Sequence, residues 1–402
     1  MKVARYYGKE DVRIEEIAEP ELRPGTVKII PAFNGICGSD LHLFHNGPMG
    51  APTADTPHPL SGETLPVVLG HEFSGVVEEI GEGVEGLQVG DSVVVEPLMV
   101  DGTCPACKAG KYNLCEQMGF VGISGRGGGL SEHIVVEQRW VHPVGDLPLD
   151  QAALIEPLAV ALHAVKHAGA SAGQTAVIGG AGPIGLLLAS VLKAKGLKTI
   201  VSEVSTARRE KAMSSGVADV VVDPSSEDLA AVVAEHTDGA GAGLAFDAAG
   251  VAAVVHQLLS VLAAGGRLEV VAIHTKPIDL NITGELIMGD RVLGGSIGYA
   301  GDHPEAIELA RSGKVNLAPF ITSKIVVNDI VEHGFNRLIA NKDNEVKILI
   351  DALTASMHDA TGHMQSTRGC AAQARPLSIT GSRVSGARCS PAGRRSGRRA
   401  GW

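Results

Sequence analysis

The stretch Thr175–Gly196, TAVIGGAGPIGLLLASVLKAKG, contains three structural signals in succession. An apolar strand-like run is followed by a glycine turn and then by an apolar helical stretch, which Gly196 is suited to end. Gly180, Gly182 and Gly185 have the spacing G-x-G-x-x-G directly after the strand. This order predicts the first strand–turn–helix unit of a dinucleotide-binding sheet.

The same alternation continues downstream. Strand-like runs recur as KTIVSE, ADVVVD, GLAFDAAG and RLEVVAI, and helical candidates lie between them at 207–214, 227–235 and 252–263. Strands that alternate with helices over such a span are typical of a doubly wound parallel sheet. We therefore predict an α/β fold for this part of the chain.

The residues around the glycine turn suggest the cofactor. The glycines would allow a tight turn, a close approach of pyrophosphate to the backbone, and close helix–strand packing, while Pro183 and Ile184 open the helix whose N-terminus faces the negative charge. Glu203 ends the next strand, where a carboxylate would bind the adenosine ribose hydroxyls and repel a 2′-phosphate. Arg208 and Arg209 weaken this inference, or are helix-surface charges. We predict NAD, with Glu203 and Arg208 among its contacts.

Composition limits the remaining alternatives. The 402 residues are 45% hydrophobic and 20% charged, as in a globular chain with room for two domains. The first residues, MKVARYYGKEDVRIEE, have no apolar run, and the charge-free window 168–192 is interrupted by glycines and Pro183. We expect a cytoplasmic protein without a membrane partner.

The charge is unevenly distributed along the chain. The formal net charge is −11, but residues 353–402 carry eight arginines and a single acid, so the body of the chain is strongly acidic. An acidic body argues against nucleic acid as a partner. The basic segment has no sustained periodicity and one aromatic residue, Trp402, so we predict a disordered, solvated tail; an arginine arm for RNA or an anionic membrane is the alternative.

The N-terminal half has a different pattern. Residues 67–97, VVLGHEFSGVVEEIGEGVEGLQVGDSVVVEP, alternate valine-rich runs with glycine turns, and residues 127–144 continue in this style. Short strands joined by glycine turns are typical of a small β-barrel. A β domain therefore precedes the dinucleotide-binding domain.

Three kinds of metal-binding side chain occur in this half and at its end. Cys37 lies in GICGSDLH, His71 and Glu72 in LGHEFSG, and Glu156 in ALIEPLAVALHAV. A thiolate, an imidazole and a carboxylate form an acceptable zinc set with one position left open, as catalysis requires. Taken singly, Cys37 is also explained as a small buried residue and His71 as a structural one.

A second candidate metal site lies in VDGTCPACKAGKYNLC, residues 100–115. Cys104, Cys107 and Cys115 have spacings that suit a metal, and Asp101 stands three residues before Cys104. Because a chain of this size without a signal peptide is expected in a reducing compartment, metal ligation is favoured over disulfides. His58, His133, His142 and His163 show no such pattern, and we expect them to be structural or surface residues.

Together these motifs resemble one family. The segments Cys37–His42 and Gly70–Glu72, the cysteine lobe, the segment Glu156–Leu158 and the glycine motif occur in the order found in zinc-dependent medium-chain alcohol and polyol dehydrogenases. The resemblance covers about Met1 to Ile350, and HPLSGETLPVVLGHEFSG is similar to (R,R)-butanediol dehydrogenases.

The resemblance implies a discontinuous architecture. A GroES-like β-barrel catalytic domain would comprise residues 1–153 and 295–352, and a Rossmann NAD-binding domain would comprise 154–294, with the active site in the cleft. Family members form dimers or tetramers, so we expect a homo-oligomer.

The resemblance also implies roles for single residues. Cys37 and His71 would hold a catalytic zinc with either Glu72 or Glu156, while Ser39 would take the substrate proton and His42 would pass it on through the cofactor ribose. The substrate would be a secondary alcohol, a vicinal diol such as 2,3-butanediol, with acetoin in reverse. Sorbitol or L-threonine dehydrogenase activity, or an inactive NAD-binding protein of the same fold, are the alternatives.

The family's structural lobe has four cysteines in the spacing C-x₂-C-x₂-C-x₇-C. In this chain Asp101 takes the first position, before Cys104, Cys107 and Cys115. Because an Asp oxygen is an allowed zinc ligand, we predict a second, structural zinc held by three cysteines and Asp101. An empty lobe with three free thiols is the alternative.

Overall fold

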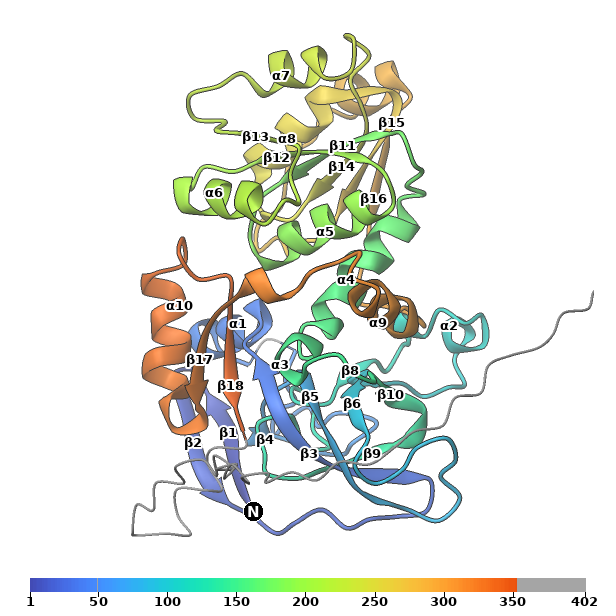
Figure 1. The fold of residues 1–402 in the computed structure, drawn as a ribbon, viewed down its shortest axis with the longest axis vertical. Coiled ribbons are helices and arrows are strands. Elements are labelled where there is room, and N and C mark those ends of the chain that lie inside the picture. Colours follow the sequence, from blue (N-terminus) through green and yellow to red (C-terminus); the bar gives the residue numbers. More distant parts are fainter. Residues whose placement is uncertain (49, 353–402) are drawn as a thin grey trace, which may run out of the picture. The chain divides into compact units, whose positions relative to one another are not determined.

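The computed structural model describes residues 1–48 and 50–352. The predicted disordered tail, 353–402, lies outside the described residues. Within the described part, two large sheets organise the chain, one of six parallel strands and one of seven largely antiparallel strands (Figure 1).

The six-stranded sheet is formed by the middle of the chain. Its strands, in spatial order, are β13 (Val220–Val222), β12 (Lys198–Ser202), β11 (Thr175–Gly179), β14 (Ala242–Asp247), β15 (Leu262–Val270) and β16 (Val292–Gly295). The connecting helices are α5 (Pro183–Ala194), α6 (Thr206–Ser214), α7 (Leu229–Glu235) and α8 (Ala252–Val261). Every neighbouring pair is parallel. The predicted α/β doubly wound sheet is confirmed.

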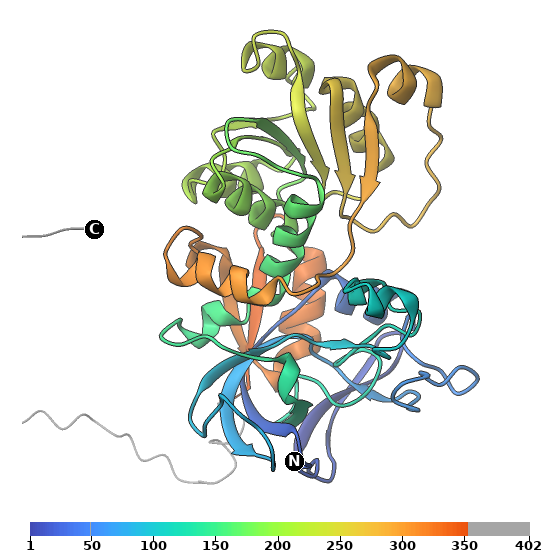
Figure 2. The same ribbon diagram turned by 90° about the vertical axis from the view of Figure 1, so that its right-hand side faces the viewer.

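Successive side chains of β11 show why the sheet is covered on both faces. Val177 packs in a core with residues of α7 and α8, whereas Ile178 packs with residues of α5 and of α4 (Ile155–His167). Neighbouring residues of a strand point to opposite faces, so a strand buried on both faces has a continuous apolar sequence. The helices on both sides of this sheet are visible in Figure 2.

The charge-free window 168–192 is divided between strand β11, the glycine turn and helix α5. None of the helices in residues 1–48 and 50–352 has both the length and the apolar character that a membrane span requires.

The seven-stranded sheet combines both ends of the described chain. Its spatial order is β10 (Val141–Pro143), β6 (Ser92–Val95), β5 (Glu72–Ile80), β3 (Thr26–Gly35), β18 (Lys347–Asp351) and β17 (Ile321–Val326), with β9 (Ile134–Glu137) also paired to β3. Its valines and isoleucines, with Phe73 and Met99, enclose one apolar core, as in a small barrel.

Strand β18 brings a late segment to the start of the chain. It pairs antiparallel with β3, so that Leu349 stands opposite Gly35. Between the two sheets, helix α9 (His303–Arg311) follows β16 and packs against α4. The predicted domain bounds, at 153/154 and 294/295, stay a prediction.

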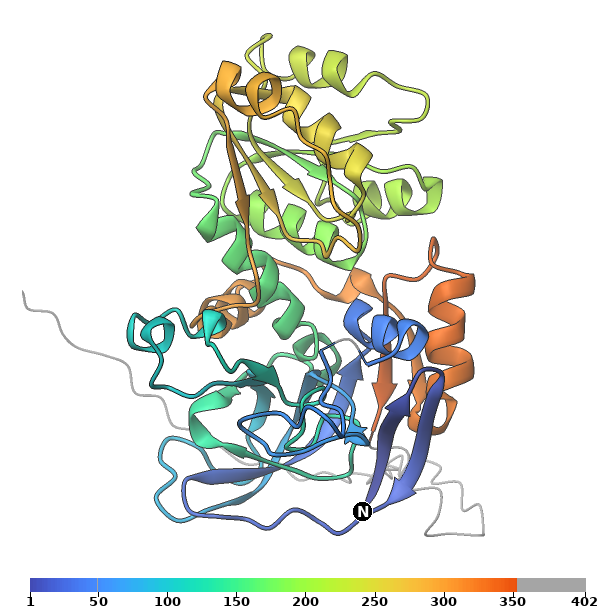
Figure 3. The same cartoon turned by 180° about the vertical axis from the view of Figure 1, so that it is seen from behind.

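The remaining elements are short. Hairpin β1 (Lys2–Gly8) and β2 (Asp11–Glu16) pairs with β4 (Val67–Val68) and is seen from behind in Figure 3. The others are α1 (Gly38–Asn46), β7 (Leu98–Met99), α2 (Pro105–Lys108), β8 (Gly119–Phe120), α3 (Leu149–Ala152) and α10 (Arg337–Ala340). Short 3₁₀ helices lie at Tyr112–Leu114, Gln138–Trp140, Ile287–Gly289, Ala318–Phe320 and Val327–Asp329, and π-helices lie at Ile282–Leu286 and Ile330–Asn336.

Candidate active site

Strand pairing brings the first group of candidate ligands together. Gly35, at the end of β3, stands opposite Glu72, at the start of β5, and Cys37 follows two residues later as the N-cap of α1. Ligand atoms of Cys37, His71 and Glu72 all lie within 4.8 Å of one another. A Cβ atom at Gly35 would collide with the Glu72 carboxylate, so a larger residue at this position would displace that carboxylate.

Polar neighbours hold the His71 ring on both sides. The Ser39 hydroxyl lies 3.1 Å from Nε2, and Asp40 Oδ1 lies 3.6 Å from Nδ1. Asp40 Oδ2 also accepts a 3.0 Å hydrogen bond from the Cys37 backbone N–H. Burial works against a charged imidazole, but the negative charges of Asp40 and Cys37 outweigh it and raise the pKa of His71. The surroundings of His71 therefore favour positive charge.

These residues fit a zinc ion. A thiolate, an imidazole and a carboxylate are common zinc donors, and three protein donors leave one position for substrate. His71 Nδ1 and Asp40 Oδ1 are buried and have no hydrogen-bond partner in the described part of the chain. Such buried atoms need an explanation, and a Zn²⁺ ion that draws His71 into its coordination shell would supply one.

Glu72 has a cationic partner that the sequence did not reveal. Lys347 Nζ lies 2.6 and 2.8 Å from the two Glu72 carboxylate oxygens and donates a third hydrogen bond to the Ile36 carbonyl at 3.0 Å. Both side chains of the pair are almost fully buried. Burial disfavours the ammonium ion, yet the charge of Glu72 outweighs it and raises the pKa of Lys347. Glu72 is thus charge-compensated from strand β18.

Glu156 approaches the same site from the start of α4. Burial, and then the charge of Glu72, raise its pKa to about 7. The buried hydroxyl of Tyr299 is close enough that the Glu156 charge adds to burial in raising the Tyr299 pKa. Glu156 is not in the close group with Cys37, His71 and Glu72, and so stands as an alternative ligand beside them.

The glycine turn has the geometry of a phosphate cradle. Gly180 has φ +100°, which favours glycine, and a Cβ atom on Gly185 would collide with the Gly180 carbonyl. At Gly182 only the Arg208 guanidinium comes within 4.0 Å of a Cβ position, so space remains beside the backbone. The partly exposed N-terminus of α5 opens there.

The Glu203 carboxylate is tied to this turn. Its two oxygens accept hydrogen bonds from the Ala181 and Ser205 backbone N–H groups, each at 2.8 Å. The Arg208 guanidinium lies 3.9 Å from Glu203 and donates to the Lys342 carbonyl at 2.6 and 3.2 Å. Both residues predicted to contact NAD therefore lie beside the glycine turn.

The lobe brings Asp101, Cys104, Cys107 and Cys115 together, with ligand atoms within 4.8 Å of one another. Asp101 Oδ1 accepts backbone hydrogen bonds from Cys104 and Thr103 at 2.8 and 2.6 Å, which lower its pKa to about 2. Burial and the neighbouring thiols raise the pKa of Cys107 to about 12. Crowded thiols ionise together only beside a cation, so this donor set also fits zinc.

Comparisons with known proteins agree with this geometry. Residues 23–146 match the alcohol dehydrogenase GroES-like domain, and residues 183–312 match the zinc-binding dehydrogenase family. The chain is 49% identical to an (R,R)-butanediol dehydrogenase of Neisseria gonorrhoeae, over 87% of this chain and 99% of the relative.

The chain belongs to the zinc-binding medium-chain dehydrogenases.

Solved structures of this dehydrogenase family extend the likeness. The crystal structure of 2R,3R-butanediol dehydrogenase from Bacillus subtilis is 42% identical and has a TM-score of 0.82, covering 87% of this chain and 99% of that one. An alcohol dehydrogenase from Escherichia coli CFT073, complexed with NADH, is 27% identical and has a TM-score of 0.78, covering 88% of this chain and 99% of that one. The protein is a zinc-binding oxidoreductase of the alcohol dehydrogenase type.

The dehydrogenase site also contains residues that sequence reasoning missed. Lys347, Tyr299 and the buried Asp40 were not singled out. A lysine inside the apolar strand KILID was a usable signal for Lys347, because an unpaired charge is rarely buried. Tyr299 had no comparable signal in the sequence.

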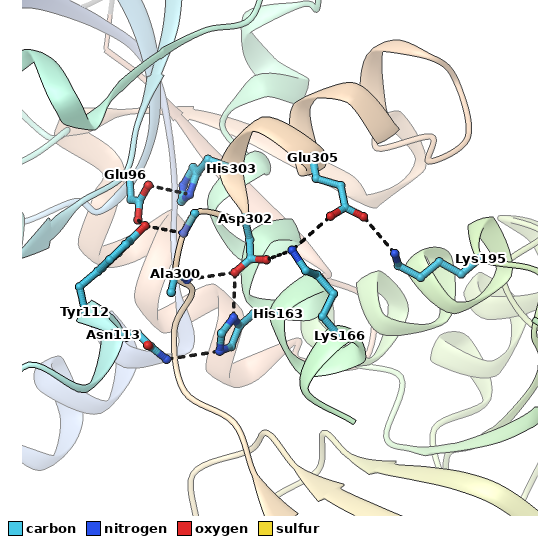
Figure 4. Close-up of polar contacts among 11 residues, drawn as sticks. Glu96, Tyr112, Asn113, His163, Lys166, Lys195, Ala300, Asp302, His303 and Glu305 are labelled. Atoms are coloured by element: carbon cyan, nitrogen blue, oxygen red, sulfur yellow. Dashed lines mark hydrogen bonds and ion pairs between the residues drawn. The ribbon is translucent and has the colours of Figure 1, made fainter. Parts of the chain in front are cut away.

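Two of the histidines expected to be structural or surface residues, His163 and His142, make polar contacts near helix α9, and Figure 4 draws those of His163. His163 Nδ1 lies 2.8 Å from Asp302, which also accepts a hydrogen bond from Lys166 at 2.8 Å. His142 Nε2 lies 3.2 Å from Glu96, close to His303. Neither histidine belongs to the group of Cys37, His71 and Glu72, which we call the catalytic cluster, or to the cysteine lobe.

Proposed function

We propose that the protein interconverts a vicinal diol of the 2,3-butanediol type and the corresponding hydroxyketone, acetoin, with NAD as the hydride carrier. The cluster of Cys37, His71 and Glu72 is the observation that carries this proposal, because it provides an open zinc set where β3 ends and its partner strand β5 begins. The relatives from N. gonorrhoeae and B. subtilis, both described as butanediol dehydrogenases, support the choice of substrate.

We assign Cys37, His71 and Glu72 as the ligands of the catalytic zinc, with Glu156 as the carboxylate that can replace Glu72. Bound zinc would polarise a substrate hydroxyl and lower its pKa, as it lowers that of water from 15.7 to about 7. Lys347 compensates the Glu72 charge, and the raised pKa of Glu156 keeps this second carboxylate partly neutral near pH 7. Two buried carboxylates can then share the site.

The proton leaves along helix α1. The Ser39 hydroxyl lies beside His71 Nε2 and can accept a proton from a hydroxyl in the open position. His42 is three residues further on the same helix, hence on the same face, with its Nδ1 3.2 Å from Asn46 Nδ2. We propose that His42 passes the proton to solvent.

NAD is held at the glycine turn by Gly180, Gly182, Pro183, Ile184 and Gly185. The pyrophosphate would meet the backbone N–H groups at the start of α5. Glu203 and Arg208 lie beside this turn, and we propose that they contact the adenosine ribose, where the Glu203 carboxylate would disfavour a 2′-phosphate.

The test is NADH formation with a panel of diols, polyols and L-threonine on protein of known zinc content. We expect 2,3-butanediol to give the highest kcat/KM, and Cys37→Ala to lower it by about a thousandfold or more while the circular dichroism spectrum stays unchanged. Highest activity on sorbitol or threonine would replace the diol assignment. NAD binding without turnover on any alcohol would identify an inactive binding protein.

We further propose a homo-oligomer that works in a reducing compartment, the cytoplasm. Strand β16 is an edge strand of the described six-stranded sheet, and it exposes Val292 and Leu293, followed by Ile297. An apolar edge strand is suited to pairing with a second copy. Cys37 and the lobe cysteines are free thiols, which a reducing compartment preserves for metal binding. Light scattering that gives a monomer mass would contradict the oligomer.

A further inference from the structure

Glu96, His142 and His303 converge at a place outside the catalytic cluster and the lobe. Glu96 follows β6, His142 lies in β10 and His303 is the first residue of α9. Glu96 Oε2 is 3.2 Å from His142 Nε2 and 3.5 Å from His303 Nδ1. One ligand atom from each residue lies within 4.8 Å of the other two.

Within the described part of the chain, no hydrogen bond compensates the burial of the His303 ring. Its side chain is 0% exposed, and neither ring nitrogen has a hydrogen-bond partner among the described residues. Glu96 is 2% exposed at its side chain, and His142 is 19% exposed. Because a buried polar group without a partner costs about 1–3 kcal/mol, two such nitrogens on one ring need a partner.

We propose that Glu96, His142 and His303 bind a divalent transition metal ion, zinc being the expected one, at a third site of this protein. A tetrahedral zinc with ligand distances of about 2.0 to 2.2 Å has ligand atoms about 3.4 Å apart. The two nitrogen–oxygen distances, 3.2 and 3.5 Å, match this separation. Two imidazoles and one carboxylate form an established kind of zinc donor set.

The surroundings orient these ligands. The Tyr112 hydroxyl donates a 2.6 Å hydrogen bond to Glu96 Oε1, which leaves Oε2 to face the histidines (Figure 4). The Tyr299 ring packs edge-on against His303, at 4.6 Å between ring centroids. Burial and the neighbouring His142 lower the pKa of His303, so its ring is neutral and carries a lone pair for a metal.

The third site has a structural role. Strands β6 and β10 belong to the seven-stranded sheet, whereas α9 packs against α4, and Asp302 beside His303 is paired with His163 and Lys166 of α4. A metal ion at this point would fasten α9 to the sheet. It shares no ligand with the other two metal sites and does not depend on the substrate proposal.

Metal content tests the proposal. The full-length protein and its variants would be saturated with Zn²⁺, freed of loosely bound ions by gel filtration, and analysed by mass spectrometry of the metal. We expect His303→Gln to contain about one ion per chain less than wild type. His133→Gln is the matched control, because His133 contacts Glu78 at 2.9 Å, outside the cluster. Equal metal content in wild type, His303→Gln and His133→Gln would overturn the proposal.

A second measurement separates this ion from those bound by cysteine. In Co²⁺-substituted protein, the thiolate-to-cobalt absorption in the near ultraviolet reports the catalytic and lobe sites alone. We expect His303→Gln to lose one Co²⁺ with this absorption unchanged, and a parallel loss of the absorption would refute the third site. If circular dichroism shows His303→Gln to be unfolded, the partly exposed His142→Gln decides by the same two measurements.

Discussion

At the scale of single residues, Lys347 is a buried cation of the candidate active site. It places a positive charge against Glu72, and both are buried. A buried ion pair contributes little net stability, but the loss of one partner leaves an uncompensated charge. Lys347 therefore supplies the charge compensation that Glu72 needs beside Cys37 and His71.

Removal of the Lys347 ammonium should leave the Glu72 charge without a partner. We expect Lys347→Met to lower the free energy of unfolding by about 3–5 kcal/mol, because Glu72 would remain buried and charged. Urea denaturation of protein stripped of its catalytic zinc measures this loss, because bound zinc would itself compensate the Glu72 charge. Lys347→Met combined with Glu72→Gln is the control, and it should recover at least half of the loss. If the double variant is as unstable as Lys347→Met, charge compensation is the wrong explanation.

The sequence predicted the residues of the site whose signals are local. Cys37, His71 and Glu72 lie in short motifs with donor side chains, and the structure brings them together as the motifs indicated. Lys347 was missed because it is 275 residues away from Glu72 and reaches it only through the pairing of β18 with β3. Nothing in the local sequence encodes that register.

At the scale of elements, substitutions in the glycine turn should change NAD binding and the stability of the fold to different degrees. Gly182 has φ −71° and open space at the Cβ position, so Gly182→Ala should fold with nearly unchanged Tm. Its new methyl group would stand where pyrophosphate approaches, and we expect the Kd for NAD to rise about tenfold or more. Fluorescence titration with NADH and thermal unfolding measure the two effects.

Gly185→Ala is the matched comparison for Gly182→Ala. Its Cβ atom would collide with the Gly180 carbonyl and push α5 away from β11. We expect a loss of about 1–3 kcal/mol in stability as well as weaker NADH binding. Equal effects of the two substitutions on Tm would contradict the different roles assigned to these glycines.

The affinity of the cysteine lobe for zinc should depend on residue 101. Asp101→Ala removes the oxygen ligand and the acceptor of two backbone hydrogen bonds, so the lobe should lose its zinc to a chelator at least about tenfold faster. Asp101→Asn keeps the hydrogen-bond acceptor but is a weaker ligand, and Asp101→Cys restores four thiolates. We expect the zinc of the lobe to be retained longest with Cys at position 101, followed by Asp, Asn and Ala, as measured with a chromogenic chelator.

Identical chelation kinetics for wild type and the three Asp101 variants would show that Asp101 does not ligate zinc. Turnover at early times should be the same in all four, because the lobe residues lie outside the catalytic cluster.

The elements themselves were largely predictable. Helix α8, for example, begins at Ala252 as expected and ends two residues before the predicted Ala263, because strand β15 begins at Leu262. Apolar period and glycine turns are local signals, so they located strands and helices well. They did not indicate how Glu96, His142 and His303 meet, since each comes from a different element.

At the scale of the whole molecule, the matched relative from N. gonorrhoeae is shorter than this chain. The N. gonorrhoeae relative is covered over 99% of its own length by 352 aligned residues, which are 87% of this chain. Strand β18 ends at Asp351, and the Ala352 backbone N–H donates a 3.0 Å hydrogen bond to Ala32.

We therefore expect truncation after Ala352 to leave kcat/KM and Tm nearly unchanged. Truncation after Val346 is the comparison, because it removes Lys347 and the whole of β18 and should prevent folding of the seven-stranded sheet. Steady-state kinetics and thermal unfolding measure both variants. A large loss of activity in the longer form would show that the basic segment belongs to the enzyme.

The position of β18 in its sheet also determines which of the two sheets can be completed first during synthesis. The parallel sheet is made from one continuous stretch and can fold as soon as it has emerged, whereas β18, one of the three strands paired with β3, is the last of the described strands to be synthesised. At about 5–20 residues per second, the 275 residues between Glu72 and Lys347 take about 15 to 55 seconds to translate. Throughout that interval the nascent chain carries the thiol of Cys37 without its finished surroundings, so oxidation of this thiol would compete with folding.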